Sequence, residues 1–209
     1  MKLVIIIALF FISATGTATA QTNYEKGMQK AFELWGQNKP GEAANMFERI
    51  ASAEPDNWLP LYWAAQINIV TSFGEQDKEK LAAKLRKGQD LLNDAKAISK
   101  SNPEIMVMQA LLHTAWIASD GATYGMTLSP KVVELYAKAE VLAPENPRVV
   151  ASKAEWNIGS AQYFGQDTAP FCEDLERALE LFAKFKPETP FHPKWGKERV
   201  EQLLESCKK

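Results

Sequence analysis

The sequence predicts an all-α protein, and two observations carry this prediction. Between turn-like segments, the apolar residues recur at spacings of three and four, which is the period of an amphipathic helix and differs from the alternation of a strand. A helix-ending phrase, in which a proline stands beside acidic or amide residues, also occurs four times along the chain. We therefore expect helices separated by sharp turns throughout the chain.

The four phrases divide the chain into units of similar length. Their prolines are Pro55, Pro103, Pro144 and Pro187, with separations of 48, 41 and 43 residues. Proline does not continue a helix interior but fits the first turn of the next helix, which Asp or Asn can cap. A period of this size is typical of stacked helical hairpins, in which each hairpin buries its apolar face against its neighbours.

Helical stripes fall in pairs between these phrases, so we expect about four hairpins and a C-terminal capping helix from about residue 194 to residue 208. The apolar members of the stripes are Met28, Ala31, Phe32 and Trp35 with Ala43, Phe47, Ile50 and Ala51; Leu61, Ala64 and Ala65 with Leu91, Ala95 and Ile98; Ile105, Met108, Leu112, Ala115 and Trp116 with Val132, Leu135, Tyr136 and Ala139; Val150, Ala154, Ile158 and Ala161 with Phe171, Leu175, Ala178, Leu179 and Phe182; and Val200, Leu203 and Leu204.

The first twenty residues have the pattern of a secretory signal peptide. Lys2 provides a positive start, an apolar run extends from Leu3 to Ile12, and Ala18, Thr19 and Ala20 form a small-residue cleavage site before Gln21. The run is too short for a membrane span, which needs about 20 residues, and no cysteine follows the cleavage site to accept a lipid. We expect residues 1–20 to be removed and residues 21–209 to form one helical domain that is periplasmic or secreted.

The net charge of −2 is small, and basic residues are mixed with acidic ones, so nothing indicates binding to nucleic acid or to an anionic membrane. The two cysteines, Cys172 and Cys207, stand on inward faces of antiparallel helices, at similar distances from the turn near Thr189. We expect a disulfide that joins the cap to the last hairpin, with two buried free thiols as the alternative.

The stretch from Tyr24 to Pro55 resembles a tetratricopeptide repeat, because Ala31, Ala43, Phe47 and Pro55 match that family's small, alanine, aromatic and proline positions. Segment 185–196 is similar to the close of a group of exported bacterial tetratricopeptide proteins. The resemblance implies a right-handed superhelix and an interaction module with no catalytic residues to map. Because the period exceeds the family's ~34 residues, we expect insertions at 72–78, 118–129 and 165–169.

Enzyme and metal signatures were not found in the sequence. His113 and His192 are the two histidines, and neither has a second metal-ligating residue at a suitable spacing. We interpret His113 as a packing residue in a helix and His192 as the partner of a structural hydrogen bond in a turn. No glycine-rich phosphate loop or nucleophile motif occurs. The sequence therefore predicts no enzyme activity, no metal site and no cofactor.

Residues 119–130 form the longest predicted loop. The segment contains two glycines together with Tyr124, Met126 and Leu128. Long ordered loops on a rigid scaffold often bind ligands, so Tyr124 is a candidate binding residue. A loop that only covers the edge of its hairpin is the alternative.

The inner surface of the stack is the other candidate binding site. Repeat alignment places Tyr62, Gln66, Thr114, Arg148 and Glu155 on this surface, with Tyr62 and Arg148 as anchors, since aromatic and Arg side chains dominate interfaces. We hypothesise a non-catalytic scaffold that binds a peptide or protein of the cell envelope. The alternatives are a small-molecule-binding protein or enzyme with a pocket near residues 119–130, and a unit that forms homo-oligomers.

Overall fold

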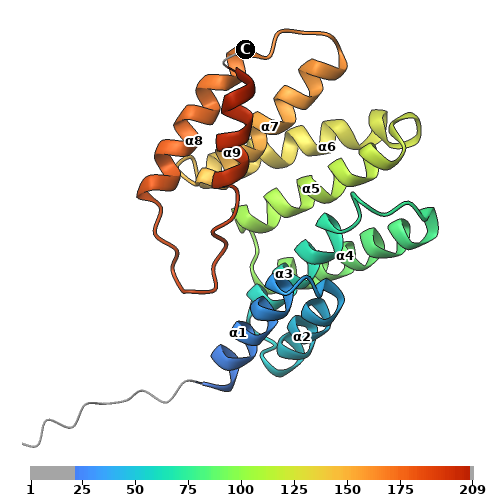
Figure 1. Ribbon diagram of the computed structural model, residues 1–209, viewed down its shortest axis with the longest axis vertical. Helices are drawn as coiled ribbons and strands as arrows, with labels where there is room; N and C mark the ends of the chain where they lie inside the picture. Colours follow the sequence, from blue (N-terminus) through green and yellow to red (C-terminus); the bar gives the residue numbers. More distant parts are fainter. Residues whose placement is uncertain (1–21, 208–209) are drawn as a thin grey trace, which may run out of the picture.

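A computed structural model describes residues 22–207, so the predicted signal peptide lies outside the described residues. The described part contains nine α-helices and one short 3-10 helix, which confirms the all-α class (Figure 1). Within residues 22–207, no helix combines the length and the apolar character that a membrane crossing requires. The elements are α1 (Asn23–Gly36), α2 (Pro40–Ala53), α3 (Trp58–Val70), α4 (Lys78–Ile98), α5 (Pro103–Ser119), α6 (Gly121–Leu142), α7 (Pro147–Tyr163), η1 (Ala169–Phe171), α8 (Cys172–Lys184) and α9 (Lys197–Cys207).

Successive helices pack as antiparallel hairpins, α1 with α2, α3 with α4, α5 with α6 and α7 with α8, and α9 packs against α8. This arrangement confirms the predicted stack of four hairpins with a terminal helix. The small side chains of Ala31 and Ala43 allow α1 and α2 to approach closely. Both residues are fully buried, as is Phe47 of α2. The described residues form one large apolar cluster, which extends from the first two hairpins into α5 and includes Phe191, and two smaller clusters in the second half.

Three of the four repeated phrases start helices in the way their sequence predicts. Asn102 and Asn146 are N-caps, and their side-chain oxygens accept hydrogen bonds from the N–H groups of Glu104 and Arg148, both at 2.9 Å. The following prolines occupy the first helical position, where a missing N–H removes no intrahelical bond. The first three phrases therefore each end one hairpin and fix the start of the next. No helix starts at the fourth phrase, because residues 185–196 connect α8 to α9 without forming a helix.

The predicted loop at 119–130 is wrong, because these residues belong to the end of α5 and the first turns of α6. Asp120 alone separates the two helices, and its carboxylate accepts hydrogen bonds from the N–H of Thr123 at 3.1 Å and from the hydroxyl of Thr123 at 2.6 Å. This cap starts a helix in spite of Gly121, Gly125 and Pro130. The insertion expected at 118–129 therefore lengthens a hairpin, whereas those at 72–78 and 165–169 do lie in connections.

The two cysteines form a disulfide, which joins the first residue of α8 to the last residue of α9. Val200 and Leu175 bury the interface between these helices. The connection between them, residues 185–196, lies at the opposite end from the disulfide. We call this segment the strap, and it determines the candidate site.

Candidate functional site

The strap leaves the end of α8, extends toward α3, and returns to α9 (Figure 1). It is fixed to the first half of the chain by buried contacts. The indole N–H of Trp63 donates a hydrogen bond to the carbonyl of Phe191 at 2.9 Å, across 128 residues of sequence. The Phe191 ring is 7% exposed and lies edge to face with Tyr24, with ring centroids 5.5 Å apart. The strap therefore belongs to the core formed by the first two hairpins.

The strap also covers both predicted anchors of the inner surface. Tyr62 has no exposed surface, and its hydroxyl accepts a hydrogen bond from the indole N–H of Trp195 at 2.9 Å. Arg148 is 1% exposed and lies beneath the Phe185 ring, 4.4 Å from the ring centroid. The expectation that these two side chains are open to a partner is therefore wrong for this conformation.

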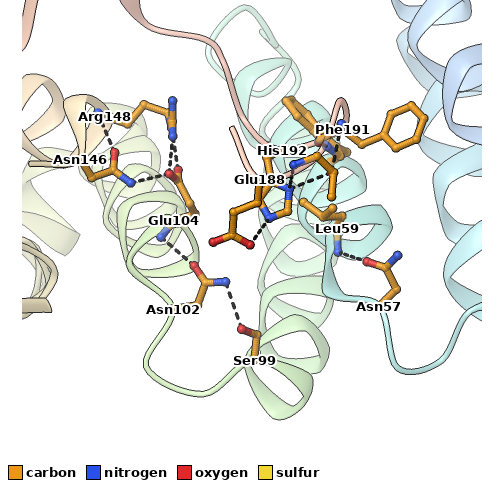
Figure 2. Close-up of polar contacts among 12 residues, drawn as sticks. Asn57, Leu59, Ser99, Asn102, Glu104, Asn146, Arg148, Glu188, Phe191 and His192 are labelled. Carbon is orange, nitrogen blue, oxygen red and sulfur yellow. Dashed lines mark hydrogen bonds and ion pairs between the residues drawn. The ribbon is translucent and has the colours of Figure 1, made fainter. Parts of the chain in front are cut away.

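Arg148 instead completes a buried ion pair that joins two hairpins. Its Nε and Nη2 atoms donate to the two carboxylate oxygens of Glu104 at 2.8 and 2.5 Å. The side-chain amide of Asn146 donates to the same carboxylate at 2.6 Å (Figure 2). Multiple charged hydrogen bonds offset the desolvation of both ions, so these residues stabilise the contact between α5 and α7.

The other predicted binding residues do not converge on one site. Gln66 is buried, and the hydroxyl of the half-buried Thr114 donates to the carbonyl of Ala110 within its own helix at 2.9 Å. Glu155 accepts a hydrogen bond from the Nε of Arg199 at 2.7 Å, which ties α7 to α9. The ring of Tyr124 packs against Trp116, with centroids 5.0 Å apart. The side chains of Thr114, Glu155 and Tyr124 are engaged within the fold, whereas the buried side-chain oxygen of Gln66 has no hydrogen-bond partner among the described residues.

A cavity of about 350 Å³ lies where the strap meets the first turns of α1 and α3. Its apolar wall consists of the aromatic rings and aliphatic groups of Tyr24, Trp58, Leu59, Pro190 and Phe191, and its polar wall consists of Glu25, Asn57, Glu188, Thr189 and His192. Ligand sites in proteins range over about 300–1,000 Å³ and combine an apolar lining with a few oriented polar groups. The volume of the cavity falls at the small end of this range, although the cavity is partly open to solvent and half of its lining residues are polar.

His192 is held in a single orientation at the cavity wall. Its Nδ1 accepts a hydrogen bond from the N–H of Thr189 at 3.1 Å, and the hydroxyl of Thr189 lies 2.8 Å from the same nitrogen. Its ring also lies edge to face with Trp58, with centroids 5.7 Å apart. The Nε2 atom lies 3.4 Å from a carboxylate oxygen of Glu188 (Figure 2). The interpretation of His192 as the partner of a structural hydrogen bond agrees with this geometry.

Burial favours neutral side chains at this wall. Desolvation lowers the pKa of His192, although the nearby carboxylate of Glu188 opposes this shift. Because Nδ1 accepts a backbone hydrogen bond, the proton of the neutral ring resides on Nε2. Burial also raises the pKa of Tyr24, whose phenol therefore remains protonated at neutral pH. The neutral His192 ring thus presents an imidazole N–H donor at the cavity wall.

Metal ligation has little support in the described residues. Among residues 22–207, no group of three or more His, Cys, Asp or Glu side chains is placed to hold a metal ion. His113 lies half-buried in α5, and its Nε2 lies 3.4 Å from the side-chain amide of Gln109. His113 lies in α5 and His192 lies in the strap, so the two histidines do not share a site.

No local pattern in the sequence predicts the cavity, although the strap carries one signal of burial. The strap contains Pro187, Pro190 and Pro193, which exclude a helix, together with the large apolar residues Phe191 and Trp195. Apolar side chains in a segment that cannot form a helix must be buried against other elements. This signal predicts a packed strap, but not which helices it contacts.

Comparison with known proteins identifies the fold. The structure is similar to that of the haemophore HusA from Porphyromonas gingivalis, with a TM-score of 0.77 and 21% sequence identity over 92% of this chain and 95% of that chain. The chain has the same fold. A thermophilic tetratricopeptide-repeat protein from Thermus thermophilus aligns more loosely, with a TM-score of 0.41 and 15% identity over 88% of this chain and 98% of that chain. No family model and no curated protein sequence matches the chain.

Proposed function

We propose that the chain is a non-catalytic binding protein that acts outside the cytoplasm and carries a small planar ligand of the porphyrin class. The observation that carries this proposal is the similarity of nearly the whole chain to a haemophore. The aromatic cavity under the strap supports it, because flat apolar rings bind well against side chains such as Tyr24 and Trp58. The disulfide fits an oxidising compartment.

The strap argues against the scaffold function that the sequence favoured. An inner groove that binds a peptide must be open, but residues 185–196 fill it in this structure and cover Tyr62 and Arg148. A small ligand requires only the cavity at the edge of the strap. Binding of a small molecule is therefore the function that we propose, with the ligand at the strap and not near residues 119–130, where the sequence analysis placed the pocket of this alternative.

The size of the cavity sets how a porphyrin is bound. A volume of about 350 Å³ is at the low end for ligand sites, so we expect one edge of the macrocycle to enter between α1, α3 and the strap. The remainder extends over the surface beside Tyr24 and Trp58. Such an edge-on site leaves part of the ligand accessible for transfer to another protein.

Titration of the purified, oxidised protein with haemin tests this function. We expect saturable binding at one site per chain, measured by the change in haemin absorbance. Tyr24→Ala and Trp58→Ala should each weaken binding by about two- to tenfold, since each removes an aromatic contact worth ~0.5–1.5 kcal/mol. Tyr163→Ala is the matched control, because Tyr163 is 83% exposed at the end of α7 and does not line the cavity.

Two results contradict the proposal at different levels. Absence of saturable binding by the folded wild-type protein would refute a porphyrin-binding function. Equal losses in Tyr24→Ala and Tyr163→Ala would place the ligand elsewhere on the molecule. Circular dichroism of each variant establishes that the helical stack is retained.

A further inference from the structure

The hydrogen-bonding groups of His192 differ in their availability. Its Nδ1 is occupied by the N–H of Thr189 at 3.1 Å, so this nitrogen is an acceptor and Nε2 carries the proton. The Nε2 atom lies on the cavity wall beside Glu188, whose carboxylate oxygen is 3.4 Å away. The ring therefore presents one N–H donor that is only weakly engaged, because 3.4 Å is longer than an ordinary hydrogen bond.

Glu188 is suited to be displaced. Its side chain is 86% exposed, whereas that of His192 is 15% exposed. An exposed carboxylate remains solvated when it leaves such a partner, so its pairing contributes little to stability. A ligand carboxylate that enters the cavity can take the same place without breaking a buried contact.

The described lining of this position contains two helix N-termini and two carboxylates, and no Lys or Arg. The first turns of α1 and α3 both line the cavity and carry a partial positive charge, although the caps Thr22 and Asn57 already accept one N–H group of each turn. Glu25, the second acidic residue of the lining, already accepts a hydrogen bond from the N–H of Thr22 at 3.0 Å in its helix cap. Of the two carboxylates that line the described cavity, Glu188 is therefore the one that pairs with His192.

We propose that the Nε2–H of His192 donates a hydrogen bond to a carboxylate of the bound ligand, and that Glu188 occupies this position in the unliganded protein. The proposal rests on the porphyrin-binding function and defines the ligand class more closely, as porphyrins that retain free carboxylates. His192 then recognises the periphery of the ligand. Ligation of iron by Nε2 requires the opposite tautomer, which breaks the hydrogen bond from Thr189.

Three ligands distinguish the possible roles of His192. They are haemin, iron-free protoporphyrin, and the dimethyl ester of protoporphyrin, in which both carboxylates are blocked. We expect His192→Phe, which keeps a ring but loses the donor, to weaken haemin and protoporphyrin binding by about tenfold or more, since a hydrogen bond to a charged group contributes ~1.5–3 kcal/mol. Binding of the diester should remain unchanged. His192→Gln retains an N–H donor and should recover part of the lost affinity.

Glu188→Gln provides the complementary test. Removal of the competing carboxylate should strengthen binding of both porphyrins with free carboxylates by several fold, on the order of the 0.2–1 kcal/mol of an exposed ion pair. Binding of the diester should not change. Glu145→Gln is the matched control, because Glu145 is exposed in the turn before α7 and does not line the cavity.

Each contrary result has a separate meaning. A loss confined to haemin in His192→Phe would establish iron ligation and overturn the proposal. An equal loss for the diester would assign His192 to stacking alone, and an unchanged affinity of His192→Phe for protoporphyrin would exclude the hydrogen bond. If the wild-type protein binds none of the three ligands, the proposed function fails, and this proposal fails with it.

Discussion

The disulfide between Cys172 and Cys207 should account for a large part of the stability of the second half of the chain. The two residues are separated by 35 positions, so the bond closes a loop that contains α8, the strap and α9. Loop-closure entropy for this length gives about 3.8 kcal/mol of stabilisation at 25 °C, because the bond restricts the unfolded chain. We therefore expect Cys172→Ser with Cys207→Ser to lower the free energy of unfolding by about 4 kcal/mol.

Equilibrium unfolding in urea measures this effect, with the helical circular dichroism signal as the probe. The wild-type protein in reducing buffer is the control, and it should unfold at nearly the same urea concentration as the double variant. The slope of free energy against urea should change as well, since an uncrosslinked chain exposes more surface on unfolding. A loss below about 1 kcal/mol, or detection of two free thiols in the oxidised protein, would refute the reasoning.

Further predictions concern buried groups. Phe191→Ala should lower the free energy of unfolding by about 3–5 kcal/mol in the same assay, because it empties a core position that is 7% exposed; a loss below about 1 kcal/mol would mean that the strap is not packed. Glu104→Gln should cost about 3–5 kcal/mol, since it leaves the Arg148 guanidinium buried without its counter-charge, and an unchanged urea midpoint would contradict a buried ion pair. Burial, and secondarily the charge of Lys131, lowers the pKa of His113 below its ordinary value of 6.5. The unfolded chain thus binds the proton more readily, so the free energy of unfolding should fall as the pH drops below about 6.5. His113→Gln should reduce this loss at acidic pH. If the free energy of unfolding of the variant has the same pH profile as that of the wild-type protein, the assignment to His113 is refuted.

Local signals determine most of the helical architecture, so the sequence predicts it well. Asn102 and Asn146 combine a cap with a following proline, and each marks a helix start that tertiary contacts do not override. Segment 119–130 shows the limit of this approach. Its glycines and Pro130 have low helix propensity, but packing of α6 against α5 together with the Asp120 cap outweighs the cost.

The candidate site was less predictable, because its walls come from distant parts of the chain. Tyr24 and Trp58 meet His192 only through the path of the strap, and no periodicity in the sequence specifies that path. Alignment to a repeat placed Tyr62 and Arg148 on the inner side, but it carried no information about what covers that side. Burial of an irregular segment depends on the complete fold, whereas helix starts depend on a few neighbouring residues.

The strap constrains how many hairpins the fold can contain, and an open array of repeats has no such constraint. Arrays in which each unit contacts only its neighbours can gain or lose units by duplication or deletion. Here Trp195 reaches Tyr62 across 133 residues, and Phe191 reaches Trp63 across 128. Insertion of one more hairpin between these partners would move them apart while the strap kept its length. The contacts between the two halves of the chain therefore constrain the number of hairpins between Tyr62 and Trp195.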